Sequence, residues 1–208
     1  MTDFSTIRYS TLFPVPLVTF EWPDGPEINR QLRESILAHE AKNSGISKSN
    51  QGGWHSDTGQ LDFCGEAGRR LVDHIYALAG EATRRVVADY KETKQPDHWS
   101  LNAWVNVNRQ GHFNKTHLHP GATWSGVYYV DIGEPDEPDS VAPLHLSDPC
   151  LGRSTSFLPK ILPSSITLRP KPGMMVLFPS YIPHMVFPHE GAGVRISIAF
   201  NLRVEPYP

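Results

Sequence analysis

Two histidines separated by a single residue are the part of this sequence that most directly suggests chemistry. His117 and His119 stand in the run HLHPG, immediately before a proline and a glycine that predict a turn. Residues two apart in a β-strand project from the same face, so both imidazoles would point to one place at a strand end. Such a pair can hold two neighbouring coordination positions of a metal ion. The alternative is a pair of half-exposed surface histidines.

A third metal ligand would have to come from a distant strand, and His184 is the best-placed candidate. An apolar strand beginning after Gly173 ends in a Pro-Ser pair, and His184 starts the strand that follows. The alternative is a histidine that merely caps a proline-rich turn. The other candidates, His112, His145 and His189, are weaker because none has a same-face partner at a strand end.

The last apolar segment of the chain carries a polar stripe. Arg195 and Ser197 lie on one face of the strand predicted over Val194–Val204, and apolar residues occupy the other face. A guanidinium buried without an anion is unfavourable in free energy, so we expect a partner inside the fold. A carboxylate ligand held by the Arg fork and the Ser hydroxyl would satisfy it. An internal salt bridge to Asp131 or Glu134 is the alternative.

The order His117-x-His119, His184, Arg195-x-Ser197 resembles that of the 2-oxoglutarate/Fe(II) oxygenases. In that family a His-x-Asp/Glu…His triad binds iron on a double-stranded β-helix, and a downstream Arg-x-Ser holds the distal carboxylate of 2-oxoglutarate. The resemblance is strongest to a bacterial and phage branch of the family. It spans nearly the whole chain, with further matching segments at 49–56, 103–107, 125–130 and 195–201.

This resemblance implies an enzyme, an Fe(II)- and 2-oxoglutarate-dependent dioxygenase that acts as a hydroxylase. His117, His119 and His184 would hold the metal, with no catalytic residue beyond these ligands. His119, however, occupies the position where the family has a carboxylate, so the site would be one negative charge short, which weakens iron binding or favours another metal. Asp131, two residues beyond Tyr129 on the same strand face, is expected to supply an acid near the site.

The cosubstrate would be 2-oxoglutarate, with Arg195 fixing its distal carboxylate and Ser197 adding a hydrogen bond. Tyr129 and Asn106 lie on strands predicted to face the same cavity. We expect them to contact the cosubstrate as well.

The resemblance leaves the prime substrate unidentified, as either a small molecule or a peptide, with dioxygen as the second reactant. Trp104 and Trp124 could wall the substrate side, although an aromatic residue in such strands is more often simply part of the core. The segments Gly133–Ser140 and Asp148–Pro159 are expected to form substrate-contacting loops, whose residues follow no readable code.

A second resemblance is to the cupins. Gly173, Pro179 and His184 match the spacing of the second cupin motif. The first cupin motif has a glutamate four or five residues after its His-x-His, where this chain has Thr123 and Trp124. The resulting alternative function is a non-catalytic, cupin-like protein that binds a metal or a small ligand.

The hydrophobic patterning predicts one mainly β domain over 1–208, with N-terminal helices. Residues 1–97 would form an α-rich part and residues 98–208 a jelly-roll core, a cupin-like double-stranded β-helix with the helices packed on one outer face. Apolar residues four apart predict helices over about 26–44 and 66–90, and a polar loop is expected over 49–57. Strands are predicted over 12–20, 99–108, 124–132, 143–146, 165–168, 174–178, 182–187 and 194–204.

The composition excludes several classes of protein. Among 208 residues, 19 Lys and Arg face 22 Asp and Glu, whereas a nucleic-acid-binding protein normally has a basic excess. No apolar run approaches the roughly 20 residues that cross a bilayer, and the N-terminus lacks the apolar block of a signal peptide. We therefore expect a cytoplasmic protein that binds neither nucleic acid nor membrane, and a homodimer stays open.

Overall fold

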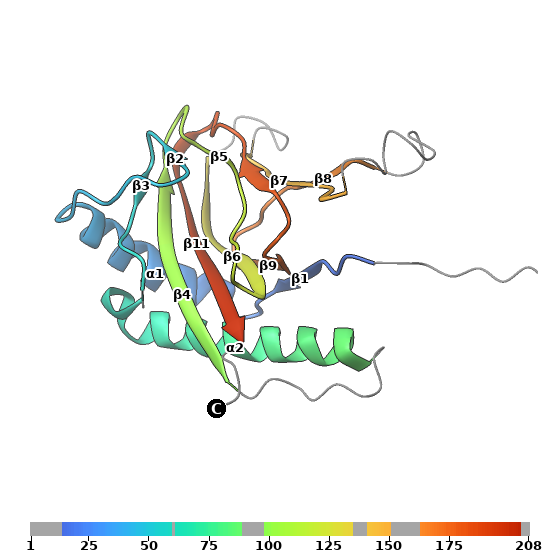
Figure 1. The fold of residues 1–208 in the computed structure, drawn as a ribbon. Coiled ribbons are helices and arrows are strands. Elements are labelled where there is room, and N and C mark those ends of the chain that lie inside the picture. The colour runs from blue at the N-terminus through green and yellow to red at the C-terminus, as the bar shows by residue number, and fades with distance from the viewer. Residues whose placement is uncertain (1–13, 60, 89–97, 135–140, 151–162, 205–208) are drawn as a thin grey trace, which may run out of the picture.

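The computed structural model describes residues 14–59, 61–88, 98–134, 141–150 and 163–204. Within these residues it contains two antiparallel sheets and two α-helices (Figure 1). The six-stranded sheet has the order β1 (Val18–Glu21), β9 (Met174–Pro179), β6 (Trp124–Glu134), β11 (Ala192–Val204), β4 (Trp99–Asn108), β3 (Trp54–His55). The five-stranded sheet has the order β2 (Asn50–Gln51), β5 (Phe113–His117), β10 (His184–Val186), β7 (Leu144–Ser147), β8 (Ser165–Leu168). This arrangement confirms the predicted jelly roll.

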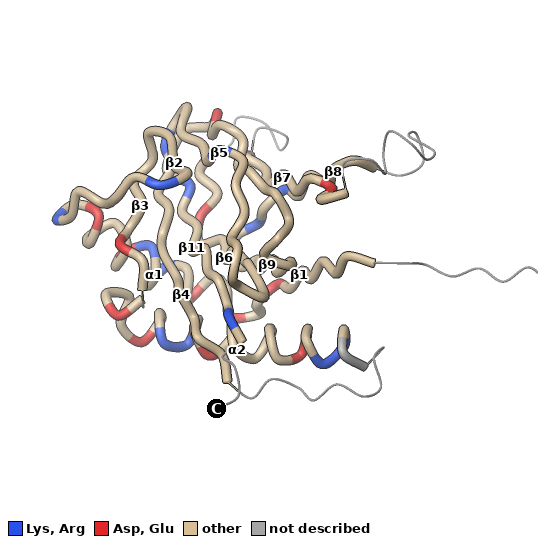
Figure 2. Tube along the Cα trace, in the orientation of Figure 1, with Lys and Arg blue, Asp and Glu red and all other residues tan. Residues whose placement is uncertain are grey.

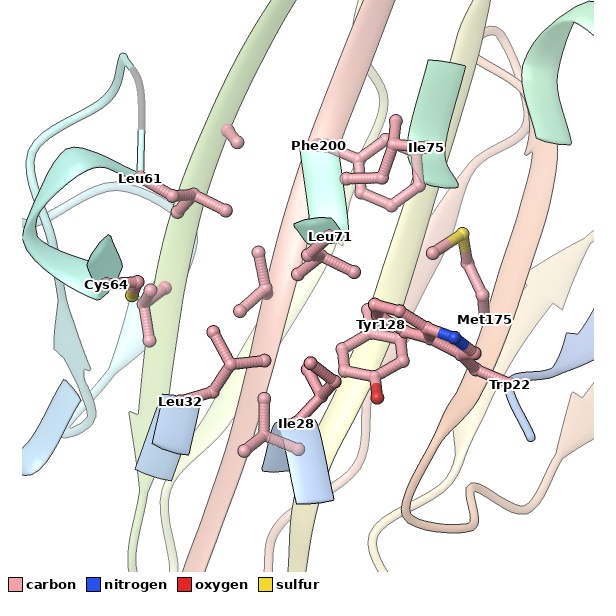
Figure 3. Packing of buried hydrophobic residues seen from close by; sticks show 14 of the residues in the cluster. Trp22, Ile28, Leu32, Leu61, Cys64, Leu71, Ile75, Tyr128, Met175 and Phe200 are labelled. Carbon is pink, nitrogen blue, oxygen red and sulfur yellow. The ribbon is translucent and has the colours of Figure 1, made fainter. Parts of the chain in front are cut away.

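The helices α1 (Gly25–Glu40) and α2 (Gly65–Ala88) cover the outer face of the six-stranded sheet, and a short 3₁₀ turn over Asp62–Cys64 leads into α2. In α1, the fully buried side chains Ile28, Leu32 and Ile36 recur every four residues and therefore form one apolar stripe. These residues pack with Leu71 and Ile75 of α2 against the sheet (Figure 3). The predicted helices are confirmed, and α1 ends four residues before the predicted stop.

Charged residues of both signs alternate along the outside of α2 (Figure 2). Arg69 pairs with Glu66, and both Arg84 and Arg85 pair with Glu81, at ion-pair distances of 2.6 to 2.8 Å. These are exposed pairs three or four residues apart on a helix, which contribute little to stability and keep this face solvated.

The central strand β11 is what positions the polar stripe. It pairs with β4 on one side and β6 on the other over most of its length. Alternation turns Ile196 and Ile198 toward the helices, where both are fully buried, and turns Arg195 and Ser197 toward the space between the two sheets. The predicted division of this strand into an apolar and a polar face is confirmed.

A β-bulge in β6 changes which way its acidic residue points. Ile196 pairs with Asp131 and the next residue of β11, Ser197, pairs with Tyr129, so Val130 is an extra residue without a partner. Tyr129 faces the space between the sheets, but Asp131 faces α1, where Arg33 Nε lies 2.8 Å from its Oδ2. The expectation that Asp131 shares a face with Tyr129 and supplies an acid near the site is therefore wrong.

Residues of the N-terminal part also enter both sheets. The segment predicted as a polar loop contains β2, which pairs with β5, and β3, which pairs with β4. Strands of two residues are too short to show a hydrophobic period, which is why the sequence pattern did not reveal them. The first 97 residues thus complete the barrel as well as covering it. The single domain over 1–208 stays a prediction.

Candidate active site

Three histidines from two neighbouring strands of the smaller sheet meet at one point. His117 is the last residue of β5 and His184 the first of β10, and the two are direct partners in the sheet. His119 follows β5 in a turn that is held by a 3.1 Å hydrogen bond from its backbone N–H to the carbonyl of Ser180. One ring nitrogen from each imidazole lies within 4.8 Å of the others. The three predicted ligands are therefore brought together.

Backbone carbonyls orient two of the three rings. His117 Nδ1 lies 2.7 Å from the carbonyl of Lys115, and His184 Nδ1 lies 2.9 Å from the carbonyl of Ile182. Because a carbonyl can only accept, each Nδ1 must carry the proton and donate. The Nε2 lone pair of each ring is consequently free, as in the usual arrangement of a metal-bound histidine.

Burial keeps all three imidazoles neutral. Loss of solvent lowers the pKa of His117, and loss of solvent together with the neighbouring histidines lowers the pKa of His119 to about 4 and that of His184 to about 3. A histidine must be deprotonated to bind a metal. At neutral pH the cluster is thus ready to coordinate a divalent ion.

Arg195 is a buried cation on the same cavity. Only 1% of its surface is exposed; its Nη1 donates to Ser197 Oγ at 3.2 Å, and its Nε and Nη2 have no partner. Tyr129 lies beside it, with the guanidinium carbon 5.3 Å from the ring centre and the hydroxyl also unpartnered. No acid within the described ranges pairs with Arg195, and Asp131 is engaged by Arg33. The salt-bridge alternative to Asp131 or Glu134 is not what the structure contains.

One cavity between the sheets connects the histidine cluster to the buried arginine. Its walls include all three histidines, Arg195, Ser197 and the two further predicted residues, Tyr129 and Asn106. Asn106 is 6% exposed, and its side-chain oxygen accepts a long hydrogen bond of 3.5 Å from Asn114. The cavity therefore presents a metal-binding end and a cationic end with hydrogen-bond donors between them. An unpaired buried guanidinium calls for an anion at that end.

Residues 102–201, which hold all of these side chains, match the model of a family described as "Putative 2OG-Fe(II) oxygenase". This part of the chain resembles the 2OG-Fe(II) oxygenases. No curated protein matches the chain in sequence. Among solved structures, the chain resembles a Pseudomonas putida prolyl-4-hydroxylase with 18% identity and a TM-score of 0.61, covering 91% of this chain and 93% of that one.

Two more solved structures share the fold. A Trichoplax adhaerens prolyl hydroxylase in complex with a peptide fragment is 14% identical with a TM-score of 0.64, covering 90% of this chain and 83% of the other. HygX from Streptomyces hygroscopicus, with nickel and 2-oxoglutarate bound, is 11% identical with a TM-score of 0.54, covering 91% and 83%. At these identities the likeness establishes the double-stranded β-helix fold of the chain.

The donors present in this cavity fit the metal and the keto acid in the description of the matched family, an Fe(II) ion and 2-oxoglutarate. Three neutral imidazoles suit Fe(II) but also suit zinc, copper and nickel, so the ligand set by itself does not select iron. The cluster contains no carboxylate. The unpartnered Arg195 Nε and Nη2 and the Tyr129 hydroxyl offer donors for a carboxylate at the other end of the cavity.

The two tryptophans expected on the substrate side separate in the structure. Trp104 lies 5.5 Å from the His119 ring and stacks on His55, with ring centres 5.7 Å apart. Trp124 instead points into the helical core, where its Nε1 donates to Thr83 Oγ1 of α2 at 2.9 Å. Trp124 therefore takes the core position and not the substrate wall, because alternation along β6 turns it toward the helices.

Residues that the sequence did not single out also lie near the histidine cluster, and His55 is the most informative of them. It is 3% exposed and lies in a second, wider hollow beside the cluster. It falls within the segment 49–56 that carries part of the family resemblance, which is the signal that could have found it. The expected loops Gly133–Ser140 and Asp148–Pro159 lie for the most part outside the described residues.

Proposed function

We propose that this protein is a 2-oxoglutarate- and Fe(II)-dependent dioxygenase, acting as a hydroxylase, in which His117, His119 and His184 hold the metal. The observation that carries the proposal is the buried, unpaired guanidinium of Arg195 on the cavity that also holds the three imidazoles. When bound, Fe(II) supplies open coordination positions for the keto acid and dioxygen. The chain's own residues bind and orient the reactants around it.

Arg195 would grip the distal carboxylate of 2-oxoglutarate, with Ser197 beside it. Planar guanidinium donors match a carboxylate in a bidentate pair, and such charge-assisted bonds are stronger than neutral ones. The Tyr129 hydroxyl, buried without a partner, would donate to the same carboxylate. Asn106 would contact the cosubstrate between the two ends of the cavity.

The walls between the sheets would keep the reaction away from bulk water. Phe178 packs on the His184 ring with centres 4.9 Å apart, and the apolar side chains Val127 and Leu144 line the same cavity. A dry cavity strengthens the attraction between Arg195 and a carboxylate. It also protects a reactive oxidant from side reactions.

A second candidate function, a non-catalytic metal-binding protein, is favoured by the absence of a carboxylate from the histidine cluster. Anaerobic titration with Fe(II) and 2-oxoglutarate separates the two. A dioxygenase is expected to give a visible metal-to-ligand charge-transfer band and to form succinate when oxygen is admitted. Metal binding with neither band nor succinate would instead support the binding protein.

Changing His119 to aspartate tests the role of the third imidazole. We expect His119→Asp to bind Fe(II) about tenfold more tightly than the parent, because a carboxylate adds the negative charge that the cluster lacks. Equilibrium dialysis with metal analysis gives the affinity. His119→Ala is the matched control, which should bind less metal than the parent. If the Asp variant binds less Fe(II) than the parent, the site is built around three imidazoles or His119 is not a ligand, and parent-like binding by the Ala variant would identify the second case.

We also propose a cytoplasmic location with an unidentified small-molecule or peptide substrate. The two cysteines, Cys64 and Cys150, are both unpaired, which supports a reducing compartment. None of the helices within the described ranges is long and apolar enough to cross a membrane. A homodimer stays a prediction.

A further inference from the structure

A wide, open hollow of about 610 Å³ lies beside the histidine cluster and shares His117, His119 and Trp104 with it. We call this hollow the outer chamber. Its volume falls within the range of small-molecule binding sites. The other residues that line it all have polar or charged side chains: Lys48, Ser49, His55, Thr58, Asn102, Lys115, Thr116 and Asn201.

The charged side chains known to line the outer chamber are both positive. Lys48 and Lys115 contribute two cationic side chains, and they are held near each other because the backbone N–H of Lys115 donates to the carbonyl of Ser49 at 3.0 Å. Neither lysine has an ion-pair partner in the described part of the chain. Among the described residues that line the chamber there is no Asp or Glu. The arginines Arg69, Arg84 and Arg85 of α2, by contrast, each pair with an acid.

Two further groups, on His55 and Asn201, can form hydrogen bonds with a ligand in the chamber. His55 Nδ1 lies 2.6 Å from the Ser56 carbonyl, so this nitrogen carries the proton and Nε2 presents a lone pair. The Ser125 hydroxyl donates to Asn201 Oδ1 at 2.7 Å, which leaves the Asn201 NH₂ group available as a donor. The flat face of Trp104, only 8% exposed and braced by the stacked His55 ring, backs the cavity.

We propose that the outer chamber binds the prime substrate and that this substrate is a small molecule carrying a carboxylate or phosphate group, held by Lys48 and Lys115. A hydroxyl or amino group of the substrate would donate a hydrogen bond to His55 Nε2. A carbonyl or other acceptor oxygen of the substrate would accept a hydrogen bond from the Asn201 NH₂ group. This inference rests on the proposed function, because the chamber is a substrate site only if the adjoining histidines hold the metal. It names the class of substrate that the function leaves open.

Benzoate, benzamide and inorganic phosphate are suitable probes, because the first two share a shape and differ in charge. In NMR titrations we expect benzoate or phosphate to shift the amide signals of Lys48 and Lys115. Benzamide should bind about tenfold more weakly, and the double change Lys48→Gln, Lys115→Gln should weaken anion binding about tenfold. Lys171→Gln, which removes the same charge from an exposed lysine that pairs with Glu21, is the matched control and should bind as the parent does.

Anion binding in the outer chamber must be distinguished from anion binding at the cosubstrate end, beside Arg195. The variant Arg195→Met removes the guanidinium and therefore distinguishes the two. Anion binding that persists in Arg195→Met and weakens in the double lysine variant supports the outer chamber. Binding that disappears in Arg195→Met and survives in the lysine variant places the anion at the cosubstrate end, which overturns this inference and leaves the proposed function standing. Equal binding of benzamide and benzoate, or no anion binding at millimolar concentration, also overturns it.

Discussion

Replacing Arg195 with lysine is expected to weaken 2-oxoglutarate binding roughly 10- to 150-fold, the loss of one charge-assisted hydrogen bond of about 1.5–3 kcal/mol. The ammonium keeps the charge but cannot reproduce the planar pair of donors that meets a carboxylate. Metal binding should stay near that of the parent, because the three histidines lie on other strands. Calorimetric titration of the keto acid into the anaerobic Fe(II) protein measures the change.

Thermal melts of the same variant distinguish the cosubstrate role from a structural one. In the absence of 2-oxoglutarate, Arg195 has two unpartnered nitrogens, so little stability should depend on its exact donor geometry. An Arg195→Lys protein with unchanged affinity for 2-oxoglutarate and a lowered melting temperature would contradict the assignment. Ser197→Ala is a milder companion, in which only the contribution of the hydroxyl is removed.

Changing His117 to alanine is expected to weaken metal binding by more than about 100-fold, exceeding the loss typical of residues that only orient a ligand. The variant should remain folded, because His117 lies at the end of β5 and is only partly buried. Metal analysis after dialysis and circular dichroism measure the two properties.

His145→Ala is the matched control for this change. His145 lies on the neighbouring strand β7 of the same sheet, but its ring nitrogen contacts Thr167 at 3.1 Å and takes no part in the cluster. That variant should retain the parent's metal content. Full metal retention in His117→Ala would remove His117 from the ligand set.

Long elements with a strong period were predictable from the sequence. The alternation along β11 placed Arg195 and Ser197 on the cavity side because ten successive residues of β11 pair with β4 and leave little freedom of register. The three histidines were predictable as a group because two come from one strand end and the third starts another strand. The ring nitrogen that each of His117 and His184 directs toward a metal depends on a contact with a backbone carbonyl, and the spacing of residues in the sequence does not reveal such contacts.

The misses have distinct physical causes. The bulge at Val130 inserts one residue into β6, and a single insertion reverses the facing of Asp131 without altering the hydrophobic pattern. The strands β2 and β3 are too short to display a period. The sequence analysis left the side of Trp124 open although the strand period decides it, since Trp124 stands an odd number of positions before Tyr129 and must face the opposite way.

The bulge in β6 has a consequence for charge selectivity inside the barrel. With regular pairing, Asp131 would project into the cavity beside Arg195 and form an internal ion pair there. A dicarboxylate entering the cavity would then have to displace the negatively charged Asp131 carboxylate from Arg195. The extra residue instead gives that carboxylate to Arg33 on the helical side. One inserted backbone unit thus leaves the Arg195 guanidinium available as a receptor for a diffusible anion.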